Sequence, residues 1–170
     1  CSLNNIEIIN QNSFNISIGG IVGYVANSTI NNCYIQNVKL NISNCSNYNG
    51  IGGIAGYIAS NTTLNNCYAS GLINTDGTAI GGLVGKIGGS TKLNNLISKV
   101  NITGSPDIFG GIAGEISGTD SSIKNTLALG NLYTSRNNVE GARIVHTSQG
   151  TTSNNYYYAN QKINGLIKES

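Results

Sequence analysis

A motif of two glycines, two apolar residues and a third glycine recurs four times along the chain and decides its fold. The four copies are Gly19-Gly20-Ile21-Val22-Gly23, Gly52-Gly53-Ile54-Ala55-Gly56, Gly81-Gly82-Leu83-Val84-Gly85 and Gly110-Gly111-Ile112-Ala113-Gly114. Successive copies begin 33, 29 and 29 residues apart. A nearly constant period of this length indicates a repeat architecture, in which each unit stacks on its neighbours.

A second motif follows the same period. Its copies are Ile30-Asn31-Asn32-Cys33, Leu64-Asn65-Asn66-Cys67, Leu93-Asn94-Asn95-Leu96 and Ile123-Lys124-Asn125-Thr126, and Ser153-Asn154-Asn155-Tyr156 is interpreted as a fifth, degraded copy. Two motifs in constant phase predict five units, which are residues 1–32, 33–66, 67–95, 96–125 and 126–160. The last unit is expected to be a degenerate cap, and residues 161–170 a C-terminal extension or linker.

Each unit is predicted to consist of short β-strands. Apolar residues alternate with a period of two, glycine interrupts every window that a helix would need, and clusters of Asn, Ser, Thr and Gly supply turns. Repeated short strands without crossover helices predict an all-β fold, a right-handed parallel β-helix (β-solenoid) of about five turns. Each turn holds roughly 30 residues, and each lies about 4.8 Å above the last.

Stacking in register predicts columns of equivalent side chains. Two inward columns are expected, one of Ile21, Ile54, Leu83 and Ile112, the other of Val25, Ile58, Ile87 and Ile116. Asn32, Asn66, Asn95, Asn125 and Asn155 are expected to form a structural ladder at a sharp corner. Asparagine tolerates the left-handed backbone that such a corner requires, and its amide can bond to the amide of the next turn.

The alternate residues of the glycine motif are expected to face outward. Gly20, Gly53, Gly82 and Gly111 would then lie beside Val22, Ala55, Val84 and Ala113 on a flat apolar face, next to an outward column of Tyr24, Tyr57, Lys86 and Glu115. Glycine within a strand weakens it unless something approaches closely. The face is therefore either covered by another segment or domain, or is a binding surface made of Tyr24, Tyr57, Val22, Ala55, Val84 and Ala113. In the second case the two tyrosines would stack on sugar rings or on a partner protein.

Composition excludes several classes of function. Only 9% of the residues are charged and the net charge is +2, so no basic face for nucleic acid is expected. No apolar run approaches the roughly 18–20 residues that membrane insertion requires. With one histidine in the chain, we expect no catalytic, metal or cofactor site. Asp107, Glu115 and Asp120 are the best acidic cluster, and they keep a polysaccharide-active β-helix enzyme as the weakest alternative.

The cysteines are expected to be structural. Cys1, Cys33 and Cys67 occupy one register, which Leu96 continues in the next unit. Side chains on adjacent parallel strands point the same way, which suits disulfide geometry poorly. We therefore expect reduced, mostly buried thiols at these three positions, whereas the redox state of Cys45 stays open.

The glycine motifs, together with Asn66-Cys67-Tyr68-Ala69-Ser70-Gly71, resemble the GLUG repeat over residues 1–132. A weaker likeness, carried by Ala142-Arg143-Ile144-Val145 and Asn154-Asn155-Tyr156-Tyr157-Tyr158-Ala159, extends to the closing unit, where Arg143 and His146 replace glycines. GLUG repeats occur in adhesin-like surface proteins and in zinc metallopeptidases of the immunoglobulin-A protease type. The chain has no His-Glu-x-x-His motif, so no residue of the protease site is carried over.

The resemblance implies an extracellular bacterial protein, secreted or anchored to the cell wall. The segment is then expected to be a non-catalytic spacer or adhesion module, with host glycan or host protein as candidate ligand. The alternative is a non-catalytic GLUG region of a secreted zinc metallopeptidase. Neighbouring domains of a longer parent chain are the expected partners, because the sequence starts at Cys1 inside a repeat and shows no signal peptide.

Overall fold

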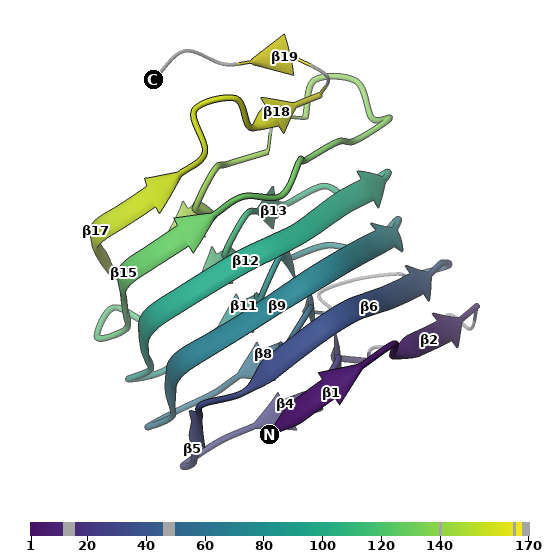
Figure 1. Cartoon of the computed structure of the whole chain (residues 1–170). Coiled ribbons are helices and arrows are strands. Elements are labelled where there is room, and N and C mark those ends of the chain that lie inside the picture. The colour runs from purple at the N-terminus through teal and green to yellow at the C-terminus, as the bar shows by residue number, and fades with distance from the viewer. Residues whose placement is uncertain (12–15, 46–49, 140, 165, 168–170) are drawn as a thin grey trace.

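The computed structural model describes residues 1–11, 16–45, 50–139, 141–164 and 166–167. Within these residues the chain forms strands and connecting turns, without a helix that could span a membrane. One sheet runs in the order β1 (Ser2–Asn4), β6 (Tyr34–Ile42), β9 (Thr63–Thr75), β12 (Lys92–Gly104), β15 (Ser122–Ala128) and β17 (Thr151–Tyr157), with β2 (Glu7–Asn10) beside β6 and β5 (Thr29–Asn31) beside β9. Its long strands form the front wall of the molecule in Figure 1.

Two sheets of shorter strands lie behind this front wall and complete each turn of the solenoid (Figure 1). The first has the order β13 (Phe109–Gly110), β10 (Ile80–Gly81), β7 (Ile51–Gly52) and β3 (Ile18–Gly19). The second has the order β16 (Val145–Ser148), β14 (Ala113–Ile116), β11 (Val84–Ile87), β8 (Ala55–Ile58) and β4 (Val22–Val25). A C-terminal pair, β18 (Lys162–Ile163) and β19 (Leu166–Ile167), is antiparallel.

Strands one repeat apart pair in parallel and in register, which confirms the predicted β-solenoid of about five turns. Leu64 lies opposite Leu93, and Leu93 lies opposite Ile123. Figure 1 shows the long strands β6, β9, β12 and β15 one above the other, with their arrowheads pointing the same way. Each middle turn therefore adds one strand to each of the three sheets, as β9, β10 and β11 do.

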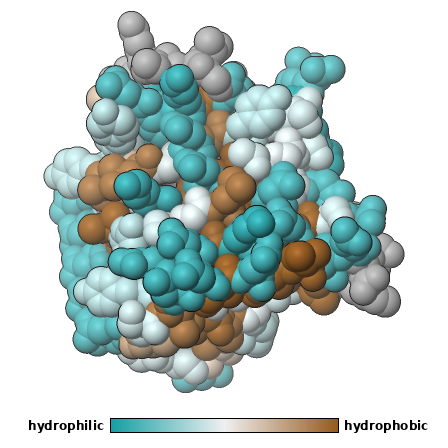
Figure 2. Space-filling model, turned by 45° about the vertical axis from the view of Figure 1, so that its right-hand side comes forward, coloured by the Kyte–Doolittle hydropathy of each residue, from teal (hydrophilic) through white to brown (hydrophobic). Residues whose placement is uncertain are grey.

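The predicted inward columns form the core. Ile54, Leu83 and Ile112 are fully buried, and so are their counterparts Ile58, Ile87 and Ile116. Ile21 and Val25 are only partly buried, because they lie in the first turn, at the open end of the stack. Figure 2 shows a hydrophobic area along this lower end of the molecule.

The predicted outward face of the glycine motif is wrong, because Ala55, Val84 and Ala113 are completely buried. The expected alternation is interrupted inside the motif. Each short strand ends at the first glycine, the chain bends over the next two residues, and the following strand begins at the fourth. The bend resets the alternation, so that the third and fourth residues both face the core.

The second glycine of each motif faces the interior and is required by close packing. A Cβ added at Gly53 would lie 2.5 Å from the carbonyl oxygen of Gly82. It would also lie 3.2 Å from Ala69 Cβ and from Val100 Cγ2, which come from β9 and β12 on the opposite wall. The body that approaches these glycines is therefore the far wall of the solenoid itself, and not another domain.

The corner role of the asparagine ladder is confirmed at Asn32, Asn66, Asn95 and Asn125. All four have left-handed backbones, with φ between 53° and 56°. Their amides link successive turns: Asn95 Nδ2 donates to Asn66 Oδ1 at 3.1 Å, and Asn125 Nδ2 donates to Asn94 Oδ1 at 2.8 Å.

The fifth member of the ladder is Asn154 and not Asn155. Asn154 has φ of 52° and donates to Asn125 Oδ1 at 3.3 Å. Asn155 pairs with Thr126 in the inward position that follows the corner, where its Oδ1 accepts hydrogen bonds from Thr126 N at 3.2 Å and Thr126 Oγ1 at 3.0 Å. The asparagine ladder below means Asn32, Asn66, Asn95, Asn125 and Asn154.

Asn95→Ala is expected to lower the free energy of unfolding by about 1–2 kcal/mol, because alanine is strained in the left-handed region and forms no bond to Asn66. Asn95→Gly keeps the backbone conformation without strain and is expected to cost less. Urea unfolding of both variants followed by circular dichroism measures the difference. A glycine variant that is less stable than the alanine variant would contradict the left-handed corner as the reason for asparagine.

The segment after the last long strand packs on the end of the stack. Ile163 is buried and bridges to Leu132, which bridges to Ile102 in the turn below. The Gln161 side chain is also buried, and its Nε2 donates to the carbonyl oxygen of Gly130 at 2.6 Å. Residues 161–164 thus cover part of the C-terminal end of the core.

Candidate binding surfaces

The two tyrosines of the predicted binding surface are neighbours on adjacent turns. Tyr24 pairs with Tyr57 in the outer column of the five-stranded sheet, and 59% of Tyr24 is exposed whereas Tyr57 is partly buried. Their rings meet edge to face, with centroids 5.4 Å apart and planes at 81°. They do not form one flat stacking surface, and of the apolar residues expected beside them only Val22 keeps any exposure.

The same outer column continues with an ion pair. Lys86 pairs with Glu115 on the next turn, as the repeat predicts, and Lys86 Nζ lies 3.2 Å from Glu115 Oε1. Both side chains are partly buried. The pair therefore links two turns, and Glu115 is engaged in structure.

A second outward column, which was not predicted from the sequence, follows the front sheet. It consists of Tyr34, Tyr68, Ile97, Leu127 and Tyr156, each paired with the next. Tyr34 is 52% exposed, Ile97 40% and Tyr156 65%. This column, called the aromatic ladder below, lies on the outer face of the longest sheet, whose other face covers the core.

The aromatic ladder and the asparagine ladder enclose a shallow groove. One depression of about 400 Å³ is lined by residues of both ladders from Asn32 to Ile97. A second, of about 520 Å³, is lined by residues of both ladders from Asn95 to Tyr156. Asn95 and Ile97 border both depressions, so the two follow one line across all five turns. None of their lining residues is charged.

A sequence signal for this groove exists. In the first two complete units, the residue two positions after the corner asparagine is tyrosine, as in Asn32-Cys33-Tyr34 and Asn66-Cys67-Tyr68. Because the cysteine between them points inward, both flanking side chains must face outward. The motif predicted the inward cysteine and the corner asparagine, but no role was predicted for the tyrosine.

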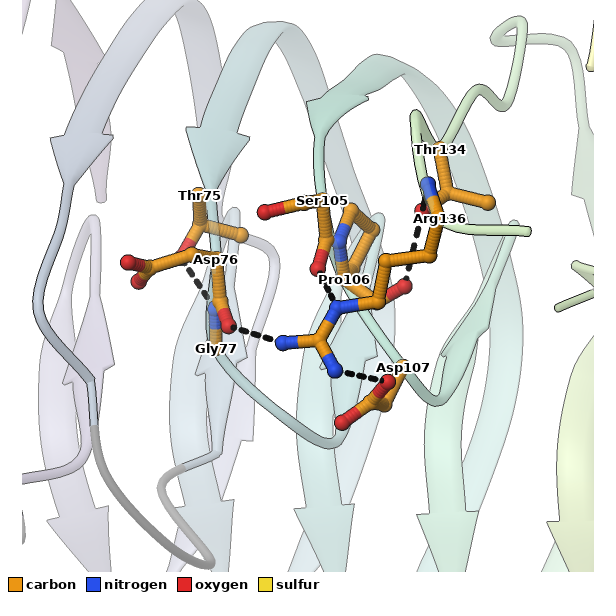
Figure 3. Close-up of polar contacts among 8 residues, drawn as sticks. All are labelled: Thr75, Asp76, Gly77, Ser105, Pro106, Asp107, Thr134 and Arg136. Atoms are coloured by element: carbon orange, nitrogen blue, oxygen red, sulfur yellow. Dashed lines mark hydrogen bonds and ion pairs between the residues drawn. The ribbon is translucent and has the colours of Figure 1, made fainter.

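A polar cluster on the corner that follows the long strands links three turns through Arg136 (Figure 3). The Arg136 guanidinium donates to Asp107 Oδ1 at 2.5 Å, to the Ser105 carbonyl oxygen at 2.6 Å and to the Asp76 carbonyl oxygen at 3.5 Å. Thr134 Oγ1 donates to the Pro106 carbonyl oxygen at 3.0 Å. These bonds satisfy backbone carbonyls at the corner, so the cluster is structural.

The carboxylates of the weakest alternative do not converge on a groove. Asp107 is paired with Arg136 at the corner. Glu115 of β14 is paired with Lys86 of β11, and Asp120 lies in the turn between β14 and β15. Among the described residues, no group of three or more His, Cys, Asp or Glu side chains is placed to hold a metal ion.

All four cysteines are free thiols, as expected for the three in register. Cys33 and Cys67 are buried, whereas Cys1 is exposed because it lies in the first turn. Burial raises the pKa of the Cys67 thiol, and burial raises the pKa of Cys45 with a further contribution from the Asp76 carboxylate. Asp76 also accepts hydrogen bonds from the backbone N–H groups of Asn44 and Cys45, at 2.9 and 3.1 Å.

The fold of the chain is similar to that of a protein whose crystal structure is known. The crystal structure of a putative immunoglobulin A1 protease from Bacteroides ovatus matches 89% of this chain with a TM-score of 0.57 and 25% sequence identity. The match covers 46% of that protein's chain, so this chain spans about half its length. The likeness supports the predicted link to proteins of the immunoglobulin-A protease type.

No family model matches the chain, and no curated protein matches it. The GLUG assignment of the glycine motifs therefore stays a prediction.

Proposed function

We propose that this chain is a non-catalytic spacer domain of an extracellular bacterial protein of the immunoglobulin-A protease type. The observation that carries the proposal is the match along almost the whole solenoid to a structure described as such a protease. The partners would be the neighbouring domains of the same parent protein, secreted or anchored to the cell wall.

The construction of the stack suits a spacer. The core is continuous from turn to turn through fully buried residues such as Ile54, Leu83 and Ile112. Backbone bonds in the sheets, the asparagine ladder and the Arg136 cluster all join one turn to another. Because neighbouring repeats stabilise one another in this way, a solenoid resists bending and holds its ends at a fixed separation.

Cleavage assays with immunoglobulin A1 test the proposal. The full-length parent protein is expected to cleave it and to lose this activity when a chelator removes zinc. The isolated chain, shown to be folded by circular dichroism, is expected to leave it intact. Cleavage by the isolated chain would overturn the non-catalytic role, and a parent protein that fails to cleave would overturn the protease type.

An adhesion module is the second candidate function. The observation that favours it is the uncharged groove between the aromatic and asparagine ladders. An adhesin would carry the same spacer but use it to present a binding surface, so the two candidates differ in the parent protein and in the ligand.

A further inference from the structure

We infer that the groove between the aromatic ladder and the asparagine ladder binds an uncharged, extended glycan chain. The inference rests on the chemistry of the groove and is independent of the identity of the parent protein. It replaces the Tyr24–Tyr57 surface, whose rings stand at 81° to each other.

The aromatic ladder supplies faces for the apolar sides of sugar rings. Tyr34 and Tyr156, at the two ends, are 52% and 65% exposed, and Ile97 between them is 40% exposed. When an apolar face of a ligand covers a row of exposed aromatic and aliphatic side chains, apolar surface is removed from water, which stabilises the complex. A pyranose ring offers such a face together with hydroxyl groups at its rim, whereas a purely apolar ligand would leave the adjacent amides without partners.

The asparagine ladder supplies the hydrogen-bonding partners for those hydroxyl groups. An Asn side chain has two N–H donors and an oxygen that can accept two hydrogen bonds. In the ladder, Asn125 Nδ2 donates once, to Asn94, and its Oδ1 accepts once, from Asn154. Asn125 therefore retains capacity for a further donor and acceptor contact, the combination that a sugar hydroxyl needs. Asn95 Nδ2 already donates to Asn65 Oδ1 and to Asn66 Oδ1, at 3.4 and 3.1 Å, so Asn95 would contribute its oxygen as an acceptor.

The shape of the groove favours a polymer over a single small molecule. Equivalent positions recur at every turn, about 4.8 Å apart, and the two depressions share Asn95 and Ile97 along one line. A chain of repeating sugar units can meet the same pair of side chains at successive turns. Several weak, equivalent contacts then add to a useful affinity.

The groove has no charged lining residue, which selects against acidic and basic ligands. The residues that line the two depressions are Asn, Tyr, Ile, Leu, Thr and Cys. Lys99 lies two residues beyond Ile97 on the outer face of β12 and Lys124 directly precedes Asn125, but neither lysine lines a depression. An anionic polysaccharide would lose hydration on entering the groove without gaining an ion pair there.

Titration of the chain with neutral tetra- to hexasaccharides of cellulose, xylan, mannan and starch, followed by calorimetry, tests the inference. At least one series is expected to bind, with affinity that rises with chain length. Tyr34→Ala and Tyr68→Ala are each expected to weaken binding about tenfold. Tyr133→Ala is the matched control, because Tyr133 is 47% exposed and lies outside the groove. It is expected to leave affinity unchanged.

Three outcomes would overturn the inference. The first is that no neutral oligosaccharide binds, and the second is that binding persists in a folded Tyr34→Ala/Tyr68→Ala double variant. The third is that polygalacturonate, an acidic polymer, binds more tightly than every neutral series. Sedimentation velocity of the wild type and of Tyr68→Ala provides a fourth such outcome: dimerisation that Tyr68→Ala abolishes would assign the groove to a second copy of this chain.

Discussion

Gly85→Ala is expected to lower the free energy of unfolding by about 3 kcal/mol, a large loss for the addition of one methyl group. A Cβ at Gly85 would lie 2.1 Å from the backbone nitrogen of Ile51. It would also lie 2.5 Å from the carbonyl carbon and 2.6 Å from the Cα of Gly50. All three atoms belong to the backbone and cannot rotate away, so two of the sheets would have to move apart.

Gly77→Ala is the matched control for this prediction. There the added Cβ would meet Ile51 Cδ1 at 3.1 Å, Thr75 Oγ1 at 3.2 Å and Cys45 Cβ at 3.4 Å, all of them side-chain atoms. Small side-chain shifts can relieve such contacts, and a loss below about 1 kcal/mol is expected. Urea unfolding of the two variants in parallel gives the comparison. Equal losses would show that backbone approach is not the reason for the glycine at position 85.

Leu83→Ala is expected to lower the free energy of unfolding by about 2–5 kcal/mol, because it leaves a cavity that the surrounding turns fill only in part. Leu83 is fully buried in the middle of the stack, in the column that contains Ile54 and Ile112. The turns above and below Leu83 are held in place by their own strand pairing, so the cavity has little freedom to collapse. Thermal and urea unfolding measure the loss.

Ile97→Ala is the control for the core prediction, because Ile97 comes from the same stack but is 40% exposed on the aromatic ladder. It should cost less than about 1 kcal/mol, as surface substitutions usually do. If both variants lost the same stability, the stack would not have an inside and an outside as described. A stable Ile97 variant also provides folded protein for glycan titration.

The repeat period was sufficient to predict the architecture, for a simple physical reason. Parallel strands in register place each residue over its equivalent, so a column of Ile54, Leu83 and Ile112 in the sequence becomes a column in space. The asparagine corners were predictable on the same grounds, since few residues other than glycine adopt the left-handed backbone without strain.

Two predictions failed where local geometry departs from simple alternation. The bend inside the glycine motif turns Ala55, Val84 and Ala113 inward, and a period-two pattern contains no sign of such a bend. In the last unit, two consecutive asparagines allow two alignments. The apolar residue and the cysteine that fix the alignment elsewhere are Thr152 and Asn155 there, so the phase was misjudged by one residue.

The groove was missed for a different reason. Its two walls come from one short motif, but the alternation that places Tyr34 and Tyr68 outward was used only to bury the cysteine between the asparagine and the tyrosine. The middle of the ladder is Ile97 and Leu127, so no run of aromatic residues in the sequence marks it. Only the pairing of the strands joins these five side chains into one surface.

Parallel pairing between equivalent residues also limits how such a protein can change its length over generations. A duplication or loss of 29 residues, the spacing of the later glycine motifs, would add or remove one complete turn of the solenoid. Every remaining residue would still be stacked on the equivalent residues of its neighbouring turns. A gain or loss of one residue inside a strand would instead exchange inside for outside from that point to the next turn. The length of the solenoid along its axis is therefore expected to change by whole turns during evolution, and the groove would lengthen or shorten with it.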